Sequence, residues 1–247
     1  GREHAIIKKI RENKAVETLY ALPVNGGMEK DAVCLPIGAC DIPAIVAFAL
    51  ENRIDYAVVA PDDPLVLGCV DRLEEAGIPC FGPRANAAVL EGSKVFSKDL
   101  MKKYGIPTAD YRVFTDLDSA LAYLESAPIP IVVKADGLAL GKGVTVAVTR
   151  EQARDAVLAA MQDKKFGKSG DRLVIEEYLT GPEVSVLAFT DGKTVKPMVS
   201  SMDHKRIGDG DIGPNTGGMG TIAPNPYYTE EIADRCMKEI FLPTVDA

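Results

Sequence analysis

The segment DHKRIGDGDIGPNTGGMG, from Asp203 to Gly220, combines residue types that can do chemistry on a small substrate. Its polar start, DHKR, can bind or polarise a substrate, and the glycines near its end let backbone N–H groups approach an anion closely. Because six of its eighteen residues are Gly and one is Pro, we expect no regular element to run through it. We interpret the segment as an ordered substrate loop, and a solvated surface turn is the alternative.

The stretch KADGLALGKG, residues 134–143, is a second glycine-rich segment, and it connects two apolar runs that we expect to be strands. Such a turn can fold over a polyphosphate while backbone amides and lysine ammonium groups neutralise its charge. The stretch fits neither the Walker A pattern nor the dinucleotide fingerprint, and a plain β-hairpin connection is the alternative. Lys134 ends the apolar run IVVK, so its ammonium group either meets an anion there or extends to the surface.

A third candidate site follows the apolar run LVI, where Glu176–Leu179 reads EEYL and Glu183 comes shortly after it. At a strand end the main chain can bind the edge of an adenine while a carboxylate binds ribose hydroxyls, and a solvated acidic turn is the alternative. Lys94 and Lys98 lie four residues apart on one face of a predicted helix. They either add positive charge near phosphates or are ordinary surface residues.

The elements that position these residues begin with an alternation of short apolar runs and helical patterns up to about residue 90, which indicates βαβ units around a parallel sheet. The expected strands lie in ETLYALP, AVCLP, IDYAVVAP and IPCFGP, and the expected helices are Arg2–Asn13, Ile42–Asn52 and Leu65–Ala76, with Asp41 as N-cap of the second and Pro64 just before the third. Ligands of open α/β sheets bind beyond the carboxyl ends of strands, so the turn PVNGG, residues 23–27, is a candidate site.

A second unit is expected to begin near residue 91 with a helix capped by Ser93 and ended by Gly105. Besides the strands on both sides of the glycine-rich turn, the patterns predict a strand at Tyr111–Phe114 and helices at Asp118–Ser126, Glu151–Gln162 and Thr229–Phe241. The runs DRLVIEEYL, PEVSVLAFT and TVKPMVS are expected to alternate as one antiparallel sheet.

Composition limits the class of protein. A chain of 247 residues that is 47% hydrophobic and 26% charged has the profile of a globular protein. Its net charge of −8 and pI near 4.9 argue against binding to nucleic acid or to an anionic membrane. The five cysteines are scattered without a C-x-x-C pair, and no apolar run approaches the length of a membrane span, so we expect reduced thiols and a cytoplasmic protein.

The order of these motifs resembles the ATP-grasp ligases: a helix lysine (Lys94), a strand lysine (Lys134), a glycine-rich turn and then EEYL with Glu183. Within that group, GREHA, PVNGG, DIPA, GPRANAAVLEGSK, VVKADGLALGKGV, the FG of residues 166–167 and DHKRIGDGDIGPNTGGMG resemble the phosphoribosylamine-glycine ligase family, also called glycinamide ribonucleotide synthetases. The resemblance covers the whole chain, and DHKR followed by GPNTGGMG is specific to this family.

The resemblance implies an α/β chain with a Rossmann-like, parallel-sheet N-terminal domain at residues 1–90, whose first strand is missing, and part of an α+β ATP-grasp domain at residues 91–247. A lid subdomain is expected at about residues 112–177. The implied activity is the ligation of glycine to 5-phosphoribosylamine with ATP and Mg²⁺ (or Mn²⁺). It gives glycinamide ribonucleotide, ADP and phosphate through glycyl phosphate, in de novo purine biosynthesis.

The resemblance also implies roles for individual residues. Those expected to bind ATP are Lys94, Lys134, Gly137, Gly141, Lys142, Gly143, Glu176, Glu177, Tyr178, Leu179 and Glu183. Those expected at the reacting groups are Asp203, His204, Lys205 and Arg206. Those expected to bind the other substrates are Gly1, Arg2, Glu3, His4, Asn25, Gly27, Asn215, Thr216, Gly217, Gly218, Met219 and Gly220. No metal ligand is assigned, and the histidines serve either in hydrogen bonding or in proton transfer.

The chain also departs from the family pattern. Family members begin with a strand and a glycine-rich turn before GREHA, and they continue past Ala247 through the residues that bind Mg²⁺. We therefore expect this chain to be roughly the first half of the usual enzyme, a monomer whose partners are the small-molecule substrates. The alternative is a nucleotide-binding module without ligase activity. A nicotinamide-dependent dehydrogenase is disfavoured because no complete G-x-G-x-x-G fingerprint is present.

Overall fold

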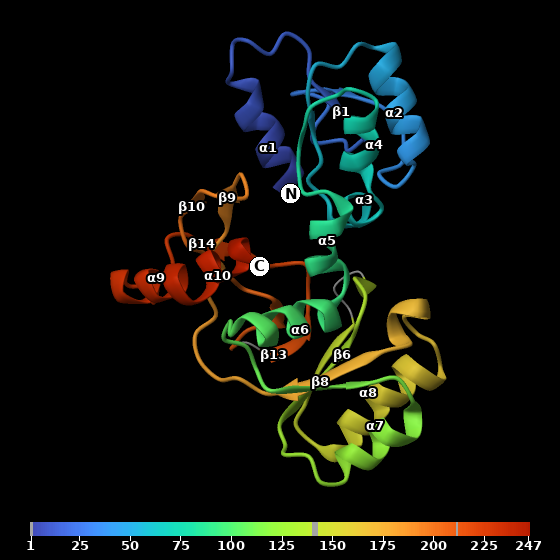
Figure 1. The fold of residues 1–247 in the computed structure, drawn as a ribbon, viewed down its shortest axis with the longest axis vertical. Coiled ribbons are helices and arrows are strands. Elements are labelled where there is room, and N and C mark those ends of the chain that lie inside the picture. The colour runs from blue at the N-terminus through green and yellow to red at the C-terminus, as the bar shows by residue number, and fades with distance from the viewer. Residues whose placement is uncertain (1, 140–142, 211) are drawn as a thin grey trace. The chain divides into compact units, whose positions relative to one another are not determined.

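The computed structural model describes residues 2–139, 143–210 and 212–247, and the side chains of residues 214 and 215 lie outside the description. The chain divides into two compact units, Gly1–Gly92 and Ser93–Ala247. Figure 1 shows the elements of both units. Each unit buries its own cluster of apolar side chains, so each has its own hydrophobic core.

The first unit alternates short strands with helices. Its strands are β1 (Tyr20–Ala21), β2 (Val33–Cys34), β3 (Ala57–Val58) and β4 (Cys80–Phe81). Its helices are α1 (Arg2–Arg11), α2 (Ile42–Glu51), α3 (Asp62–Val66), α4 (Cys69–Glu75) and α5 (Ala85–Gly92). The pairing is parallel, as predicted, but β1 pairs with β2 and β3 pairs with β4 in two separate sheets. The described strands of this unit therefore pair two by two and do not form the single sheet that we expected.

Glycine at position 68 explains a second difference in this unit. We predicted one helix from Leu65 to Ala76, and the prediction was wrong because α3 ends at Val66 and α4 starts at Cys69. Between them Gly68 has a φ of 81°, in the left-handed region that breaks a helix and favours glycine. The N-cap of α2 is as predicted, since the Asp41 side chain accepts a hydrogen bond of 3.2 Å from the main-chain N–H of Ala44.

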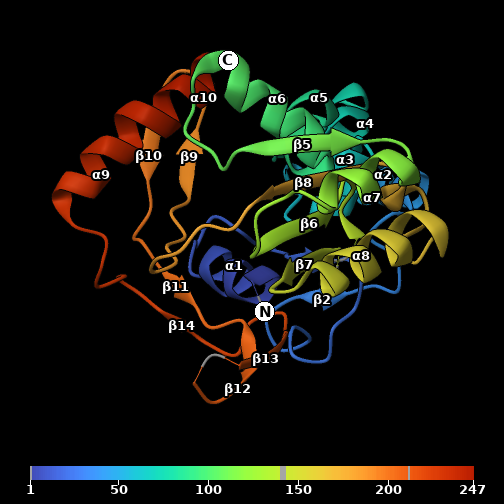
Figure 2. The same cartoon turned by 90° about the horizontal axis from the view of Figure 1, so that it is seen from below.

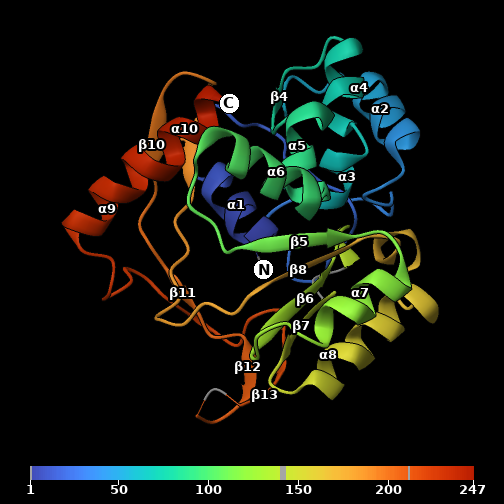
Figure 3. The same ribbon diagram turned by 60° about the horizontal axis from the view of Figure 1, so that its bottom comes forward.

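The second unit is built around a four-stranded antiparallel sheet in the order β5–β8–β6–β7. These strands are β5 (Tyr111–Phe114), β6 (Ile131–Ala135), β7 (Val144–Ala147) and β8 (Leu173–Glu177). The helices of this region are α6 (Lys94–Tyr104), α7 (Leu117–Leu124), α8 (Arg150–Val157) with its π-helical continuation Leu158–Gln162, and a 3-10 turn at Gly167–Gly170. Figure 3 shows α7 and α8 on one side of this sheet and α6 on the other.

The two faces of this sheet differ in chemistry because successive side chains of a strand point to opposite faces. Ile131 and Val133 of β6, with Leu173 and Ile175 of β8, belong to the core that includes α7 and α8. Lys134 of β6 and Glu176 of β8 alternate with these core residues. They therefore lie on the face that α6 covers. The caps of α6 are as predicted, with Ser93 at its start and a left-handed glycine at its end.

After this sheet the chain forms smaller pairs of strands. They consist of β9 (Ala188–Thr190), β10 (Val195–Pro197), β11 (Met202–Asp203), β12 (Arg206–Gly208), β13 (Ile212–Asn215) and β14 (Thr221–Ile222). We predicted one antiparallel sheet for residues 171–201, and this was wrong. β8 pairs on both edges with β5 and β6, so no edge remains for β9 or β10, which pair with each other.

A helical segment ends the described part of the chain. It comprises α9 (Glu230–Cys236), the π-helical turn Met237–Phe241 and α10 (Leu242–Asp246), and Thr229, where we predicted the helix to begin, is its N-cap. It runs five residues beyond the predicted end, and Figure 2 shows it beside β9 and β10. Within the residues that the structure describes, no helix has the length and apolar character that crossing a membrane requires.

Candidate functional site

The sheet face beneath α6 carries a buried carboxylate between two lysines. Glu176 Oε2 lies 2.6 Å from Lys98 Nζ, and Glu176 Oε1 forms an ion pair with Lys134 Nζ. The side chains of Glu176 and Lys98 are 7% and 9% exposed, whereas that of Lys134 is 27% exposed. A buried charge is tolerated where it is paired, so each of these groups stabilises the others. Lys134 therefore meets an anion, but this anion is a carboxylate of the chain itself, and the predicted contact of Lys134 with phosphate stays a prediction.

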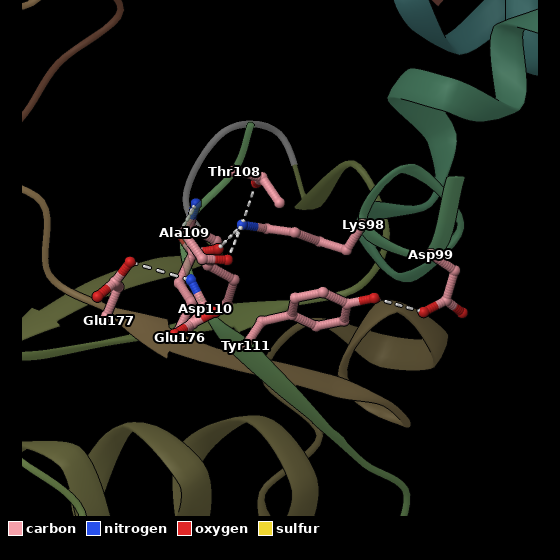
Figure 4. A network of polar contacts seen from close by, with 9 residues as sticks. Lys98, Asp99, Thr108, Ala109, Asp110, Tyr111, Glu176 and Glu177 are labelled. Carbon is pink, nitrogen blue, oxygen red and sulfur yellow. Dashed lines mark hydrogen bonds and ion pairs between the residues drawn. The ribbon is translucent and has the colours of Figure 1, made fainter. Parts of the chain in front are cut away.

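Lys98 is held by more than its ion pair. Its Nζ donates hydrogen bonds to Thr108 Oγ1 at 2.7 Å and to the main-chain oxygen of Ala109 at 3.2 Å. It also lies 5.5 Å from the centroid of the Tyr111 ring, a cation–π contact. Figure 4 shows Lys98 extending from α6 to these groups and to Glu176. Lys98 is not an ordinary surface residue, because the helix face that carries it packs on the sheet, and its predicted contribution of positive charge near phosphates stays a prediction.

Tyr111 links this network to the outside of α6. Its hydroxyl donates a hydrogen bond of 2.7 Å to Asp99 Oδ1, as Figure 4 shows. Burial, together with the hydrogen bond to the Asp99 carboxylate and its negative charge, raises the pKa of Tyr111 to about 12. The phenol therefore stays neutral at physiological pH and acts as a fixed donor.

Lys94 and the glycine-rich turn, both expected from the resemblance to bind ATP, are in contact. Lys94 Nζ donates a hydrogen bond of 2.7 Å to the main-chain oxygen of Gly137. The main-chain N–H of Lys94 also donates to the main-chain oxygen of Asp136 at 3.0 Å. The first turn of α6 is therefore bonded to the start of the glycine-rich turn at two points.

Asp136 links the glycine-rich turn to α6, and the sequence reasoning did not single it out. Its buried carboxylate accepts hydrogen bonds from Ser93 Oγ at 2.9 Å and from the main-chain N–H of Val95 at 2.8 Å, and it forms an ion pair with Arg172. A carboxylate at a helix N-terminus is favoured by the helix dipole and by the free N–H groups there. The signal in the sequence was an aspartate directly after an apolar strand and directly before a glycine.

The glycines that flank the turn are required by close packing. A Cβ added at Gly137 would overlap Ser169 Oγ and would lie 2.8 Å from Ser169 Cβ. A Cβ added at Gly143 would lie 2.8 Å from that of Ala139. Side chains at these positions would push the turn away from the sheet. Two predicted ligands of the turn, Gly141 and Lys142, lie outside the described residues.

The strand end that we assigned to adenine is partly occupied by internal contacts. The main-chain N–H of Glu177 donates to the main-chain oxygen of Asp110 at 2.9 Å, and Glu177 Oε1 accepts from the N–H of Asp110 at 3.1 Å. Tyr178 and Leu179, which follow, are exposed. The Glu183 carboxylate forms an ion pair with Lys205, which joins the predicted ribose ligand to a residue predicted at the reacting groups.

The segment from Asp203 to Gly220 is an irregular β-hairpin, and the prediction that no regular element runs through it was wrong. Asp203 of β11 is in register with Thr221 of β14, and Arg206 of β12 is in register with Asn215 of β13. Between these pairs, the N–H of His204 donates to the main-chain oxygen of Gly220 at 2.9 Å. The polar start and the glycine-rich end that we singled out therefore lie side by side in the hairpin.

Glycine conformations explain how the hairpin tolerates this composition. Gly210, between β12 and β13, has a φ of 73°, and Gly213, within β13, has a φ of 86°. Gly218 has a φ of 111°, and a Cβ there would lie 2.9 Å from Asp203 Oδ1. Cross-strand hydrogen bonds order the segment, so its many glycines did not prevent strand pairing. Thr216 contributes both its N–H and its hydroxyl, which donate to the main-chain oxygen of Lys205 at 2.7 and 2.8 Å.

In the first unit, the predicted substrate residues His4, Asn25 and Gly27 are close together. His4 Nε2 lies 2.8 Å from Asp31 Oδ2, and a Cβ added at Gly27 would lie 3.3 Å from His4 Nδ1. Asn25 Oδ1 accepts a hydrogen bond of 3.0 Å from the N–H of Gly27, which shapes the turn. The hydrogen bond from His4 lowers the pKa of Asp31, a residue that the sequence reasoning did not single out. Arg2 and Glu3 lie on α1, and Gly1 lies outside the described residues.

The parallel strand pairs and helices of the first unit are those of a Rossmann-like N-terminal unit. The four-stranded sheet of the second unit, with its lysine-bearing face and glycine-rich turn, belongs to an ATP-grasp domain. The solved phosphoribosylamine–glycine ligase of Thermotoga maritima matches 99% of this chain and 58% of its own, with a TM-score of 0.82 and 29% identity. The biotin carboxylase domain of Hydrogenobacter thermophilus 2-oxoglutarate carboxylase, solved with MgADP, matches 98% of this chain and 54% of its own. Its TM-score is 0.74, and at 21% identity it shows a shared fold alone.

Family models identify the chain more narrowly. Residues 1–91 match the N domain of phosphoribosylglycinamide synthetase, and residues 92–247 match the ATP-grasp (A) domain of the same family. The chain belongs to the phosphoribosylglycinamide synthetase family. Two curated relatives, the phosphoribosylamine–glycine ligases of Vibrio cholerae and Halalkalibacterium halodurans, are each 49% identical to it over 247 residues. The matches cover 99% and 100% of this chain, which spans 58% of the length of each relative.

Proposed function

We propose that this chain takes part in the ATP-dependent ligation of glycine to 5-phosphoribosylamine, which gives glycinamide ribonucleotide, ADP and phosphate in de novo purine biosynthesis. Membership of the family supports this proposal, as do the printed names of its curated relatives. The single observation that carries it is the bond from Lys94 Nζ to the main chain of the glycine-rich turn, which follows β6, the strand that carries Lys134. Two ammonium groups and a turn of small residues are the parts that a polyphosphate requires.

On the nucleotide side, Lys94, Lys134 and the turn from Gly137 to Gly143 would bind the phosphates of ATP, and residues 112–177 would form a lid over them. Because the Glu176 carboxylate is held between two lysines, we assign the adenine contact to the main chain of residues 176–179. Glu183 would accept hydrogen bonds from the ribose hydroxyls while it keeps its ion pair with Lys205. The lysines would neutralise the triphosphate, and the carboxylate would accept hydrogen bonds from the ribose, so these groups suit a nucleoside triphosphate.

On the acceptor side, Asp203, His204, Lys205 and Arg206 would line the site with residues 215–220, which the hairpin places beside them. A carboxylate oxygen of glycine would attack the γ-phosphorus of ATP, and ADP would leave. The amine of phosphoribosylamine would then attack the acyl carbon of glycyl phosphate, lose a proton and release phosphate. The cationic residues of DHKR would neutralise charge on the transferred phosphoryl group. For His204, hydrogen bonding and proton transfer both stay open.

In the first unit, His4, Asn25 and Gly27, with Gly1, Arg2 and Glu3 at the start of the chain, would bind the ribose phosphate. Mg²⁺ or Mn²⁺ is proposed as the ion that accompanies the ATP phosphates. Within the described ranges, no cluster of three or more His, Cys, Asp or Glu could hold a metal ion, so we assign it no ligands. We place the protein in the cytoplasm as a monomer, consistent with five cysteines that are free of disulfides.

Phosphate release by the 247-residue chain tests this proposal. The assay contains ATP, Mg²⁺, glycine and freshly generated phosphoribosylamine, and each component is omitted in turn. Release that requires all of them, and that falls in Lys134→Met, supports the ligase. ATP binding without release supports the alternative, a nucleotide-binding unit that is catalytically incomplete. Absence of ATP binding would overturn both assignments.

A further inference from the structure

Two lysines share one buried carboxylate, so this group of three side chains carries one more positive than negative charge. Lys98 reaches Glu176 from α6, and Lys134 reaches it from the neighbouring strand β6. A single lysine would be enough to neutralise the glutamate. The presence of the second lysine therefore needs another explanation. The difference in burial between the two lysines suggests one.

Lys98 is the fixed partner of the pair. Its side chain is 9% exposed, and Thr108 and Ala109 accept hydrogen bonds from its ammonium group in addition to the contact with Glu176. Lys134 is three times as exposed, at 27%, and Glu176 is the polar partner that the structure shows for it among the described residues. An ammonium group with one partner and access to solvent can turn to another anion at lower cost than one with three buried partners.

We infer that Lys98 is a positioning residue: it keeps Glu176 neutralised so that Lys134 can leave this carboxylate for the phosphates of a nucleotide. This inference rests on the proposed function, in which Lys134 binds ATP. Removing one member of a buried ion pair leaves an uncompensated charge, which is strongly unfavourable. Without Lys98, movement of Lys134 to a phosphate would leave Glu176 buried and unpaired. With Lys98 in place, Glu176 keeps a partner whether or not a nucleotide is bound.

The inference predicts a specific pattern of ATP affinities. In Lys98→Met, Lys134 is the remaining cation at Glu176, so ATP binding should weaken by about tenfold or more. In the double variant Lys98→Met with Glu176→Gln, no carboxylate retains Lys134, so the affinity should return to within about threefold of the unsubstituted chain. Lys98→Arg keeps the charge and should also stay within about threefold.

The matched control is Lys102→Met, which removes one positive charge from an exposed position of the same helix. It should change ATP affinity by less than about twofold, because exposed charges are screened by solvent and salt. The chain contains no tryptophan, so the dissociation constant is measured by titration calorimetry rather than by intrinsic tryptophan fluorescence. Thermal unfolding of every variant shows whether the fold is retained.

The outcomes separate this inference from the proposed function. Weak binding in Lys98→Met with recovery in the double variant supports the inference. If Lys98→Met lowers the melting temperature but leaves ATP affinity unchanged, Lys98 is a structural residue and the inference is overturned. If the double variant stays as weak as Lys98→Met, Lys98 does not act through Glu176, and the inference is again overturned. If Lys134→Met binds ATP as well as the unsubstituted chain, the proposed nucleotide site itself is wrong.

Discussion

Lys94 Nζ donates a hydrogen bond of 2.7 Å to the main-chain oxygen of Gly137, so the helix lysine of the site is bonded to the turn that would cover the phosphates. The two residues belong to different elements, and Asp136 joins those elements again through Ser93 and Val95. A ligand that binds Lys94 would therefore act directly on the base of the glycine-rich turn. If the nucleotide binds Lys94 as proposed, its binding and the placement of the turn would be coupled through this bond.

Replacement of Lys94 by Met should weaken ATP binding by about tenfold or more, because the variant loses a charge-assisted contact to phosphate and the bond to the turn. Titration calorimetry with ATP measures the effect, and Lys102→Met on the same helix serves as the control for net charge. Unchanged affinity in Lys94→Met, with binding lost in Lys134→Met, would remove Lys94 from the phosphate site.

Replacement of Gly137 by Ala should destabilise the second unit by about 1–3 kcal/mol, because the new Cβ would overlap Ser169 Oγ. Urea unfolding followed by far-UV circular dichroism measures the loss. The double variant Gly137→Ala with Ser169→Gly removes the overlapping side chain and should recover part of the stability. The control is Gly26→Ala, because open space surrounds the position of its Cβ. Gly167→Ala is unsuitable because Gly167 has a φ of 54°. Equal stability of Gly137→Ala and the unsubstituted chain would contradict the packing argument.

The hydrogen bond from Tyr111 to Asp99 predicts a dependence of stability on alkaline pH. The pKa of Tyr111 is raised from 10.0 to about 12, so the folded state binds this proton more tightly than the unfolded state does. The contribution of Tyr111 is complete below about pH 10 and is lost as the pH rises through about 12. At about pH 8, the unsubstituted chain should exceed Tyr111→Phe in free energy of unfolding by about 0.5–1.5 kcal/mol.

Urea unfolding of both proteins at several pH values between about 8 and 12 measures this difference, and the ionisation of other groups cancels between them to a first approximation. The difference should shrink as the pH rises above about 10. A difference that stays constant over this range would show that the phenol does not titrate in the way that its burial and the Asp99 contact require.

Local signals in the sequence predicted the helices and strands of the site better than the contacts between its side chains. The helix that carries Lys94 begins after Ser93 and ends at Gly105, because capping chemistry is contained in the residues next to each end. The partner of Lys98 could not be predicted in this way, since Glu176 comes from a distant strand whose register is set by pairing with β5 and β6. The same long-range pairing moved residues 173–177 out of the sheet that we had predicted for them. The roles assigned to individual site residues stay predictions.

Asp203 and Gly218 allow the acceptor side of the site to be tested separately from the nucleotide side. Alanine at position 218 would place a Cβ 2.9 Å from Asp203 Oδ1 and would force a φ of 111° on a residue with a side chain. The Asp203 carboxylate would then have to move away from residue 218, while Lys94, Lys134 and the glycine-rich turn would keep their places. We expect Gly218→Ala to bind ATP within about twofold of the unsubstituted chain and to lose about tenfold or more of the phosphate release that depends on glycine and phosphoribosylamine.

The control for this variant is Gly210→Ala in the same hairpin. Gly210 also has a positive φ, of 73°, but open space surrounds the position of its Cβ, so it introduces backbone strain without the contact to Asp203. If both variants lose phosphate release equally, general disruption of the hairpin explains the loss, and the pairing of Asp203 with the glycine-rich end has no special role. A larger loss in Gly218→Ala assigns the effect to that pairing. Because the charged residues next to Asp203 are held by the same cross-strand bonds, such a result would also place DHKR at the reacting groups rather than at the nucleotide.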